Sequence, residues 1–321
     1  MALKRNKTKY ISYILFTSLI LSLGSCNQND EKATITSWVI PDKYKQERTD
    51  EKGQVVEVTY STKDYVDGTD KVEEKKTNVY LPYNYDESKQ YNIIYLIHGT
   101  DRQSVNHIET WLYTVGIKNV LDNMIFYNDI DPVIVVTPSF YSYGLYGDDN
   151  MTNIREVTPV KEKSTKNFGY ELRYDLIQAV ESKYSTYAEG VDEKSLIDSR
   201  DHRAMAGLSN GARITLDGGM TQNFDYISWF GCFSSSIESS KIIEAIHSEK
   251  NKNYKLNYLF NADGIYDFAY NAHKKMYEEL LKDESFNENN LEYVEIAFGY
   301  HSPRSWQISM YDALQRFFKE A

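Results

Sequence analysis

The sequence predicts an α/β domain built on a mostly parallel β-sheet with helices on both faces. Short apolar runs alternate along the chain with segments of helical period, and such runs are typical of parallel strands buried on both sides. With 321 residues, 41% of them hydrophobic, the chain can fill one large core, because single cores stop growing at about 250–300 residues. We therefore expect one folded domain behind a short N-terminal extension.

The strand candidates fall into two groups. Residues 55–60 and 76–81 are β-type runs that predict an antiparallel strand pair at the start of the domain. Six further apolar runs are expected to form the rest of the sheet: 93–97, 132–136, 204–206, 227–230, 256–260 and 292–296.

Helical periods separate these strands. One helical face is predicted from apolar side chains spaced three and four residues apart: Ile117, Val120, Leu121, Met124 and Ile125. Similar faces occur over 172–184 and, at the end of the chain, over 306–317. The polar stretch 147–166 predicts a long loop or insertion.

Residues 1–25 differ in kind from the rest. Four early cations precede an apolar run over 10–23, which is too short for a comfortable membrane span of about 20 residues and is typical of an export signal. Leu23-Gly24-Ser25-Cys26 resembles a bacterial lipobox, which predicts cleavage and lipidation at Cys26. A plain secretory signal and an uncleaved anchor are the alternatives. We expect an exported protein, either a membrane-anchored lipoprotein or extracellular, with 26–53 as a polar tether and 54–321 as the folded domain.

Charge and cysteine content exclude some functions. The formal net charge is −11, and loss of the signal with its cations makes the mature chain more acidic still, so nucleic acid is not an expected partner. The second cysteine, Cys232, lies in an apolar stretch. We expect it to be a buried, inert thiol and expect no intramolecular disulfide.

The segment Gly207-Leu208-Ser209-Asn210-Gly211 carries the pattern G-x-S-x-G. Alone this pattern is a weak signal, but here it directly follows an apolar strand and precedes a helical segment, as a nucleophile elbow requires. The glycines suit a tight turn in which strand and helix approach closely. Ser209 is therefore the predicted nucleophile, and a glycine-rich turn with a bystander serine is the alternative.

A serine nucleophile needs a base and an acid, which in the α/β-hydrolase fold follow in the order acid, then histidine. His301 follows the last predicted strand and is the expected base. Asp263 and Asp267 both follow the strand before it, and the reach of the loop favours Asp267.

The remaining histidines have other expected roles. His98 is expected to be a structural hydrogen-bonding group, and the other four read as surface or helix residues: His107, His202, His247 and His273. None has metal-ligand spacing, so no metal is expected.

An ester hydrolase of this kind also needs amides aimed at the oxyanion. The amides of Asn210, after the nucleophile, and Thr100, in the loop after 93–97, are the candidates. Tyr141, Tyr143 and Tyr146 follow the strand at 132–136 and either form a wall that stacks a phenolic ring or pack within their loop.

The chain resembles the esterase D-like α/β-hydrolases, and among them the feruloyl and acetylxylan esterases of carbohydrate esterase family 1. The resemblance runs from about residue 53 to the C-terminus and rests on these segments: 79–86, 91–99, 121–124, 132–138, 207–211, 264–270, and His301 followed by Trp306. It implies the α/β-hydrolase fold, a triad of Ser209, Asp267 and His301, and no cofactor. The sequence departs from the family at 100–103, where a glycine-rich stretch is usual, and at Asn210, where Met is common.

The resemblance also implies a substrate, an acyl ester on plant cell-wall polysaccharide such as xylan, with ferulate favoured over acetate. Trp306 joins the three tyrosines as a candidate substrate-binding residue. An acetylxylan esterase, an esterase for another small acyl or siderophore ester, and an inactive glycan-binding lipoprotein are the alternatives. The cytosolic formylglutathione hydrolases are also similar, but the export signal argues against them.

Overall fold

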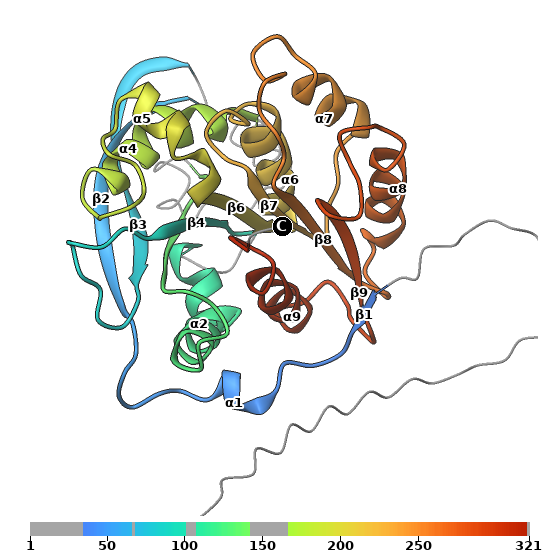
Figure 1. Cartoon of the computed structure of the whole chain (residues 1–321), viewed down its shortest axis with the longest axis horizontal. Helices are drawn as coiled ribbons and strands as arrows, with labels where there is room; N and C mark the ends of the chain where they lie inside the picture. The colour runs from blue at the N-terminus through green and yellow to red at the C-terminus, as the bar shows by residue number, and fades with distance from the viewer. Residues whose placement is uncertain (1–34, 66–67, 101–106, 142–165, 320–321) are drawn as a thin grey trace, which may run out of the picture. The chain divides into compact units, whose positions relative to one another are not determined.

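A mostly parallel sheet organises the fold, which the computed structural model describes over residues 35–65, 68–100, 107–141 and 166–319 (Figure 1). Its strand order is β1-β9-β8-β7-β6-β4-β5-β3-β2. Strands β2 and β3 form the antiparallel pair at one edge, and β3 is also antiparallel to β5. The predicted fold class is confirmed by this sheet.

The strands are bounded as follows: β1 (Ile35–Ser37), β2 (Gln54–Asp64), β3 (Thr69–Leu81), β4 (Asn92–Ile97), β5 (Val133–Pro138), β6 (Arg203–Leu208), β7 (Trp229–Phe233), β8 (Tyr258–Gly264) and β9 (Leu291–Ile296). All residues of β5, β6 and β7 are buried, which explains why their sequences are continuously apolar rather than alternating.

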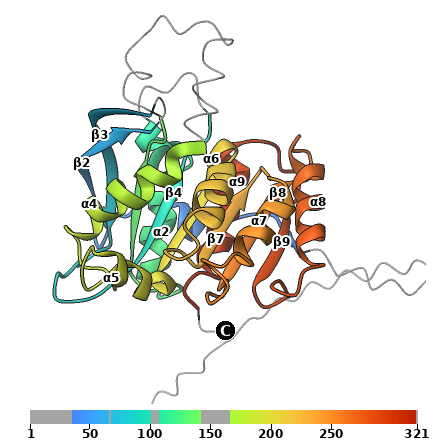
Figure 2. The same ribbon diagram turned by 90° about the horizontal axis from the view of Figure 1, so that it is seen from above.

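Helices cover both faces. Those described are α1 (Asp42–Lys45), α2 (Ile117–Phe126), α4 (Ile177–Glu181), α5 (Glu193–Asp198), α6 (Asn210–Ile214), α7 (Ser239–Ile246), α8 (Tyr270–Leu280) and α9 (Pro303–Leu314). The tighter or wider turns are η1 (His107–Glu109), η2 (Thr110–Thr114), η4 (Leu172–Leu176), η5 (Arg200–His202) and η6 (Thr215–Thr221). Seen from above, α4, α6, α7 and α8 lie over one face (Figure 2), and α2 and α9 lie against the other (Figure 1).

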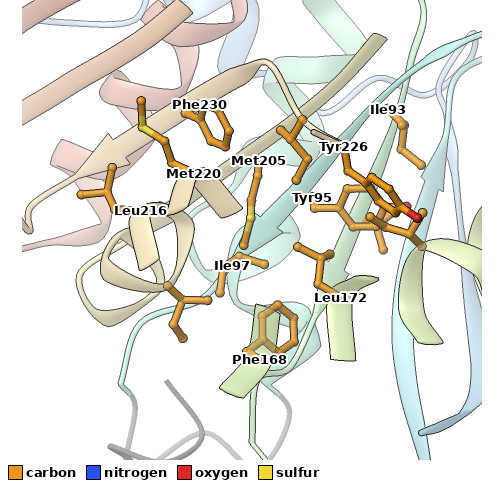
Figure 3. Close-up of a cluster of buried hydrophobic side chains, with 14 of the residues drawn as sticks. Ile93, Tyr95, Ile97, Phe168, Leu172, Met205, Leu216, Met220, Tyr226 and Phe230 are labelled. Atoms are coloured by element: carbon orange, nitrogen blue, oxygen red, sulfur yellow. The ribbon is translucent and has the colours of Figure 1, made fainter. Parts of the chain in front are cut away.

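Alternate strand residues supply two cores. In β4, Tyr95 and Ile97 pack under η4, α4 and η6, whereas Ile94 and Leu96 pack against α2 and α9. Figure 3 shows part of the first core, in which Met205 and Phe230 of the sheet meet Leu172, Leu216 and Met220 from the helical side. Because side chains alternate along a strand, one continuous apolar run fills both cores.

Residues 35–53 are not the tether that we expected, because they belong to the folded unit. Strand β1 pairs in parallel with β9, and the side chains of Ile40 and Tyr44 are buried. The Asn123 side chain donates to the carbonyls of Tyr44 and Gln46. The pairing of β1 with β9, these two buried side chains and the hydrogen bonds from Asn123 hold this polar segment against the folded domain.

The antiparallel pair is longer than predicted, since it continues through charged positions. Lys75 of β3 is only 3% exposed, and its Nζ lies 2.6 Å from Oε1 of Glu171, which also accepts a hydrogen bond from Tyr60. A buried ion pair thus takes the place of apolar alternation here.

Several predicted features lie outside the described residues: the signal segment 1–25, Cys26 and nearly all of the loop at 147–166. Among the helices that are described, none combines the length and the apolar character that a membrane crossing requires.

Candidate active site

Three loops at the carboxyl edge of the sheet carry the predicted triad residues. Ser209 follows β6, Asp267 follows β8, and His301 follows β9. Because β6, β7, β8 and β9 are neighbours in the parallel part of the sheet, their carboxyl ends lie side by side. The strand order therefore brings together residues that are up to 92 positions apart.

Ser209 has the backbone of a nucleophile elbow. Its φ and ψ are 53° and −120°, in a region that costs energy for a residue with a side chain. A Cβ on Gly207 would lie 2.2 Å from the Gly211 carbonyl oxygen, and one on Gly211 would lie 2.2 Å from that of Ile97. Both glycines are therefore required by close backbone approach, as the motif predicts.

The three side chains form a continuous hydrogen-bonded chain. Ser209 Oγ lies 3.0 Å from His301 Nε2, and His301 Nδ1 lies 3.0 Å from each oxygen of Asp267. The imidazole is 21% exposed, whereas the Asp267 side chain is fully covered. This is the geometry of a nucleophile, a base and an orienting carboxylate.

Asp267 is held in its charged form. Burial works against ionisation, but hydrogen bonds from His301, the Ala269 amide and Ser234 outweigh it, so the pKa of Asp267 lies below its usual value. The Ala269 amide donates to Oδ1 at 2.9 Å. A carboxylate that stays ionised can stabilise an imidazolium beside it.

Asp263 has a different partner. Its Oδ2 lies 2.6 Å from Nδ1 of His273, whose Nε2 lies 3.0 Å from Asn261 Oδ1. Burial disfavours the charged imidazole, but Cys232 and Asp263 outweigh this and raise the pKa of His273 to about 10. The structure thus separates the two aspartates that the sequence left as alternatives.

Two further residues, Trp306 and Ser234, contact the triad residues and each other. Trp306 packs edge-on against the His301 ring at 5.0 Å, and its Nε1 donates to Ser234 Oγ at 2.9 Å. Sequence reasoning placed Trp306 among the substrate-binding candidates and missed Ser234. The available signal was position, because Ser234 directly follows β7, which lies between the strands that carry Ser209 and Asp267.

Both candidate oxyanion residues belong to segments that adjoin Ser209. Helix α6 begins at Asn210, the residue after Ser209. The loop of Thr100 also approaches closely, since a Cβ on Gly99 would lie 3.1 Å from Ser209 Cβ.

His98 fixes this loop in place. Its Nδ1 donates to the Gly99 carbonyl at 2.6 Å, and its Nε2 accepts from the Phe140 amide at 3.4 Å. Burial, with a smaller contribution from His107, holds the pKa of His98 well below its usual value. The neutral ring therefore acts as a structural hydrogen-bonding group.

The tyrosine candidates differ in what can be described. Tyr141 is buried, and its ring packs 4.8 Å from His107 and 4.4 Å from Phe140, which favours the loop-packing alternative. Tyr143 and Tyr146 lie outside the described residues.

Two histidines are more buried than we expected. His107 stacks on His98 at 4.7 Å, and His273 is completely buried beside Asp263. Polar partners and ring stacking compensate for their burial, and neither feature is visible in the local sequence. Within the described ranges, no group of three or more His, Cys, Asp or Glu side chains could hold a metal ion.

Comparisons with known proteins agree on the type of enzyme. The model of the Esterase family, described as "Putative esterase", matches residues 72–317. The chain is also 31% identical over 285 residues to endo-1,4-beta-xylanase Y of Acetivibrio thermocellus. That alignment covers 84% of this chain but only 23% of the xylanase.

Solved structures show the same fold. A mutant of the feruloyl esterase module from Clostridium thermocellum, complexed with sinapinate, is 29% identical and superimposes with a TM-score of 0.74 over 90% of this chain and 96% of that module. A ferulic acid esterase from Anaeromyces mucronatus, in complex with ferulic acid, has a TM-score of 0.65 at 21% identity over 87% of this chain and 96% of the other, a likeness of fold.

Proposed function

The chain belongs to the Esterase family and is a carboxylic ester hydrolase of the feruloyl and acetylxylan esterase type in carbohydrate esterase family 1, and from this premise we propose that it releases ferulate from plant cell-wall polysaccharide such as xylan. The observation that carries the chemistry is the contact of Ser209 Oγ with His301 Nε2 at 3.0 Å. The choice of ferulate as the acyl group rests on the similarity to the feruloyl esterase module, which covers 90% of this chain.

In the proposed acylation, Ser209 Oγ attacks the ester carbonyl carbon while His301 Nε2 accepts the hydroxyl proton. Asp267 holds the Nδ1 proton and stabilises the imidazolium that forms. The Asn210 and Thr100 amides donate to the oxyanion, and each such donor is worth about 2.7–4 kcal/mol. The tetrahedral intermediate then expels the sugar alkoxide, which takes the proton from His301.

Deacylation repeats the sequence with water. His301 removes a proton from water, the hydroxide attacks the acyl carbon, and Ser209 leaves with the proton that His301 returns. The products are a free carboxylic acid and the sugar hydroxyl, and the chain's own groups perform every proton transfer.

We also propose that the protein is exported and lipidated at Cys26. The cationic start, the apolar run and Leu23-Gly24-Ser25-Cys26 support this. Expression of the full chain in a bacterial host with labelled fatty acid should yield a labelled protein in the membrane fraction, and Cys26→Ala should abolish the label. An unlabelled wild-type protein would exclude the anchor without affecting the esterase proposal.

The acyl specificity is tested with purified protein on methyl ferulate, feruloylated arabinoxylan and acetylated xylan. We expect ferulate release from the first two to exceed acetate release from the third at equal ester concentration. Release of acetate alone would make the protein an acetylxylan esterase, and a fluorophosphonate probe that never labels the protein would favour an inactive glycan-binding protein.

Ser209→Ala should abolish turnover without unfolding the chain. Loss of the nucleophile removes the acyl-enzyme route, and in serine hydrolases it lowers kcat by roughly 10⁶-fold. The Ser209 side chain is only partly buried, so its removal should leave the melting temperature nearly unchanged. Retained hydrolysis in a folded Ser209→Ala variant would refute the proposed mechanism.

A further inference from the structure

Five aromatic side chains stand exposed on the loops that follow β8, β9 and β1. Phe268 is 82% exposed, and the other four are between 55% and 61% exposed: Tyr266, Phe298, Tyr300 and Trp38. Aromatic rings normally bury most of their surface, so an exposed group of them beside a catalytic site calls for a ligand. We call these five residues the aromatic strip.

The aromatic strip begins at the candidate active site and consists of neighbouring ring contacts on adjacent loops. The Phe268 ring lies 4.3 Å from the ring of His301, Tyr266 lies 5.2 Å from Tyr300, and Trp38 lies 5.7 Å from Phe298. Strands β1, β8 and β9 are parallel neighbours, so all of these loops lie at the carboxyl edge. The strip therefore leads from His301 toward the β1 edge of the sheet.

The loops that present the strip are held rigidly. The Tyr266 amide donates to the Gly299 carbonyl at 2.9 Å, and the Ala297 amide donates to that of Ser37. Phe298 has a φ of +55°, a strained conformation that the surrounding hydrogen bonds maintain. Arg304 donates to the Trp38 carbonyl at 2.8 Å. The rings are thus pre-organised, and a ligand would not have to order them.

We propose that the aromatic strip binds the neutral pyranose chain that carries the ester, on the side of the linkage away from the acyl group. This inference rests on the proposed function. Flat aromatic faces pack well against the C–H faces of pyranose rings, and the tyrosine hydroxyls can exchange hydrogen bonds with sugar hydroxyls. A neutral polymer also suits a chain with a net charge of −11, which would repel a polyanion.

The test is a comparison of a large and a small ester of the same acid. The variant is Trp38→Ala/Phe298→Ala, which removes the end of the strip farthest from Ser209. On feruloylated arabinoxylan its KM should rise on the order of tenfold, which corresponds to a loss of about 1.4 kcal/mol of binding free energy for the two rings together. On methyl ferulate, which has no sugar, kcat and KM should match wild type.

Tyr187→Ala is the matched control. Tyr187 is a partly exposed aromatic that stacks on His202 at the amino end of β6, on the opposite edge of the sheet. It should leave both substrates unaffected. If Trp38→Ala/Phe298→Ala hydrolyses the polymer as wild type does, or loses activity on both esters equally, the inference is overturned.

A direct binding measurement separates this inference from the proposed function. Ser209→Ala protein should be retarded by unesterified arabinoxylan in affinity electrophoresis, and adding the two strip substitutions should remove the retardation. If the wild-type protein hydrolyses methyl ferulate but Ser209→Ala protein is not retarded, the aromatic-strip inference is overturned and the proposed function stands. The inference would also be overturned if the wild-type protein sediments as a dimer, the Trp38→Ala/Phe298→Ala variant sediments as a monomer, and the two have the same kinetics on the polymer. That result would show that a second copy of the chain covers the strip.

Discussion

Asp263 lies near the end of β8 and Asp267 lies in the loop that follows it. The two carry the same functional group, but their different partners give them different roles. Asp267 meets His301 with both oxygens, whereas Asp263 is buried against His273. Hydrogen bonds to a carboxylate favour its charged form, so the same contacts that orient His301 keep Asp267 ionised.

Asp267→Asn should lower kcat by roughly 10⁴-fold, because a neutral amide neither fixes the tautomer nor stabilises the imidazolium. Asp263→Asn should instead lower stability, by about 3–5 kcal/mol, because it leaves the buried His273 cation unpaired. Steady-state kinetics and urea unfolding of both variants measure the two effects. A larger rate loss for Asp263→Asn would reverse the assignment.

Asp312 of α9 predicts a pH dependence of stability. Burial raises its pKa to about 6, although Ser37 and Arg316 oppose the shift. Since the folded-state pKa exceeds that of an exposed aspartate, the stability that the protonated carboxyl contributes is complete below about pH 4 and is lost as pH rises through 6.

Asp312→Asn should therefore stabilise the protein at pH 8 by about 3 kcal/mol, since it removes a buried charge whose pKa is raised from 3.8 to about 6. The difference from wild type should shrink as the pH falls to 4.5. Urea unfolding at both pH values measures it, with Asp131→Asn, an exposed carboxylate, as control. A gain that is the same at both pH values would show that Asp312 titrates normally.

At the scale of elements, the site depends on how closely the loops after β8 and β9 approach each other. A Cβ on Gly264 would lie 2.3 Å from the Gly299 backbone carbon, so these loops touch through their backbones. One loop carries Asp267 and the other carries His301, and this contact sets the distance between them.

Gly264→Ala should push the two loops apart and lower kcat/KM on methyl ferulate by at least about 10²-fold, the usual consequence of a misplacement near 1 Å. Gly190→Ala is the control, because its new Cβ would meet only side-chain atoms of Asp192 and Ser195. Wild-type kinetics in Gly264→Ala would mean that the loops adjust without moving the triad.

At the scale of the whole molecule, the segment 35–53 contributes β1, which forms one edge of the sheet, and α1, which packs against α2. Tyr44 donates to Asp129, and the Gly53 amide donates to Asp122 Oδ1 at 2.8 Å. Strand β1 also positions Trp38 at the end of the aromatic strip.

A chain beginning at residue 54 should be less stable than one beginning at residue 34. Loss of the buried Ile40 and Tyr44 side chains alone removes about 3–6 kcal/mol, a large part of the 5–15 kcal/mol that typical domains have. Thermal unfolding of both chains measures the difference, with Ile40→Ala as a point variant and the exposed Glu47→Ala as its control. Equal melting temperatures for the two chains would show that residues 34–53 add no stability and act only as a tether.

The sequence by itself determined the fold class, the approximate positions of the parallel strands other than β1, and the family. Continuous apolar runs reflect burial on both faces of each strand, and Gly207 and Gly211 reflect a local turn that tolerates no side chain, so these features are recorded in neighbouring residues. The export signal and Cys26 are likewise sequence predictions, and they stay predictions.

Only the tertiary structure decided which groups meet across long stretches of chain. Strand order brought the carboxyl ends of β8 and β9 together, and tertiary packing gave Asp267 to His301 and Asp263 to His273. Tertiary packing also buried His107 and His273, placed β1 on the sheet and gathered the aromatic strip from three separate loops. The physical reason is that each contact joins residues remote in sequence, and its energy depends on burial and on partners that no local pattern records.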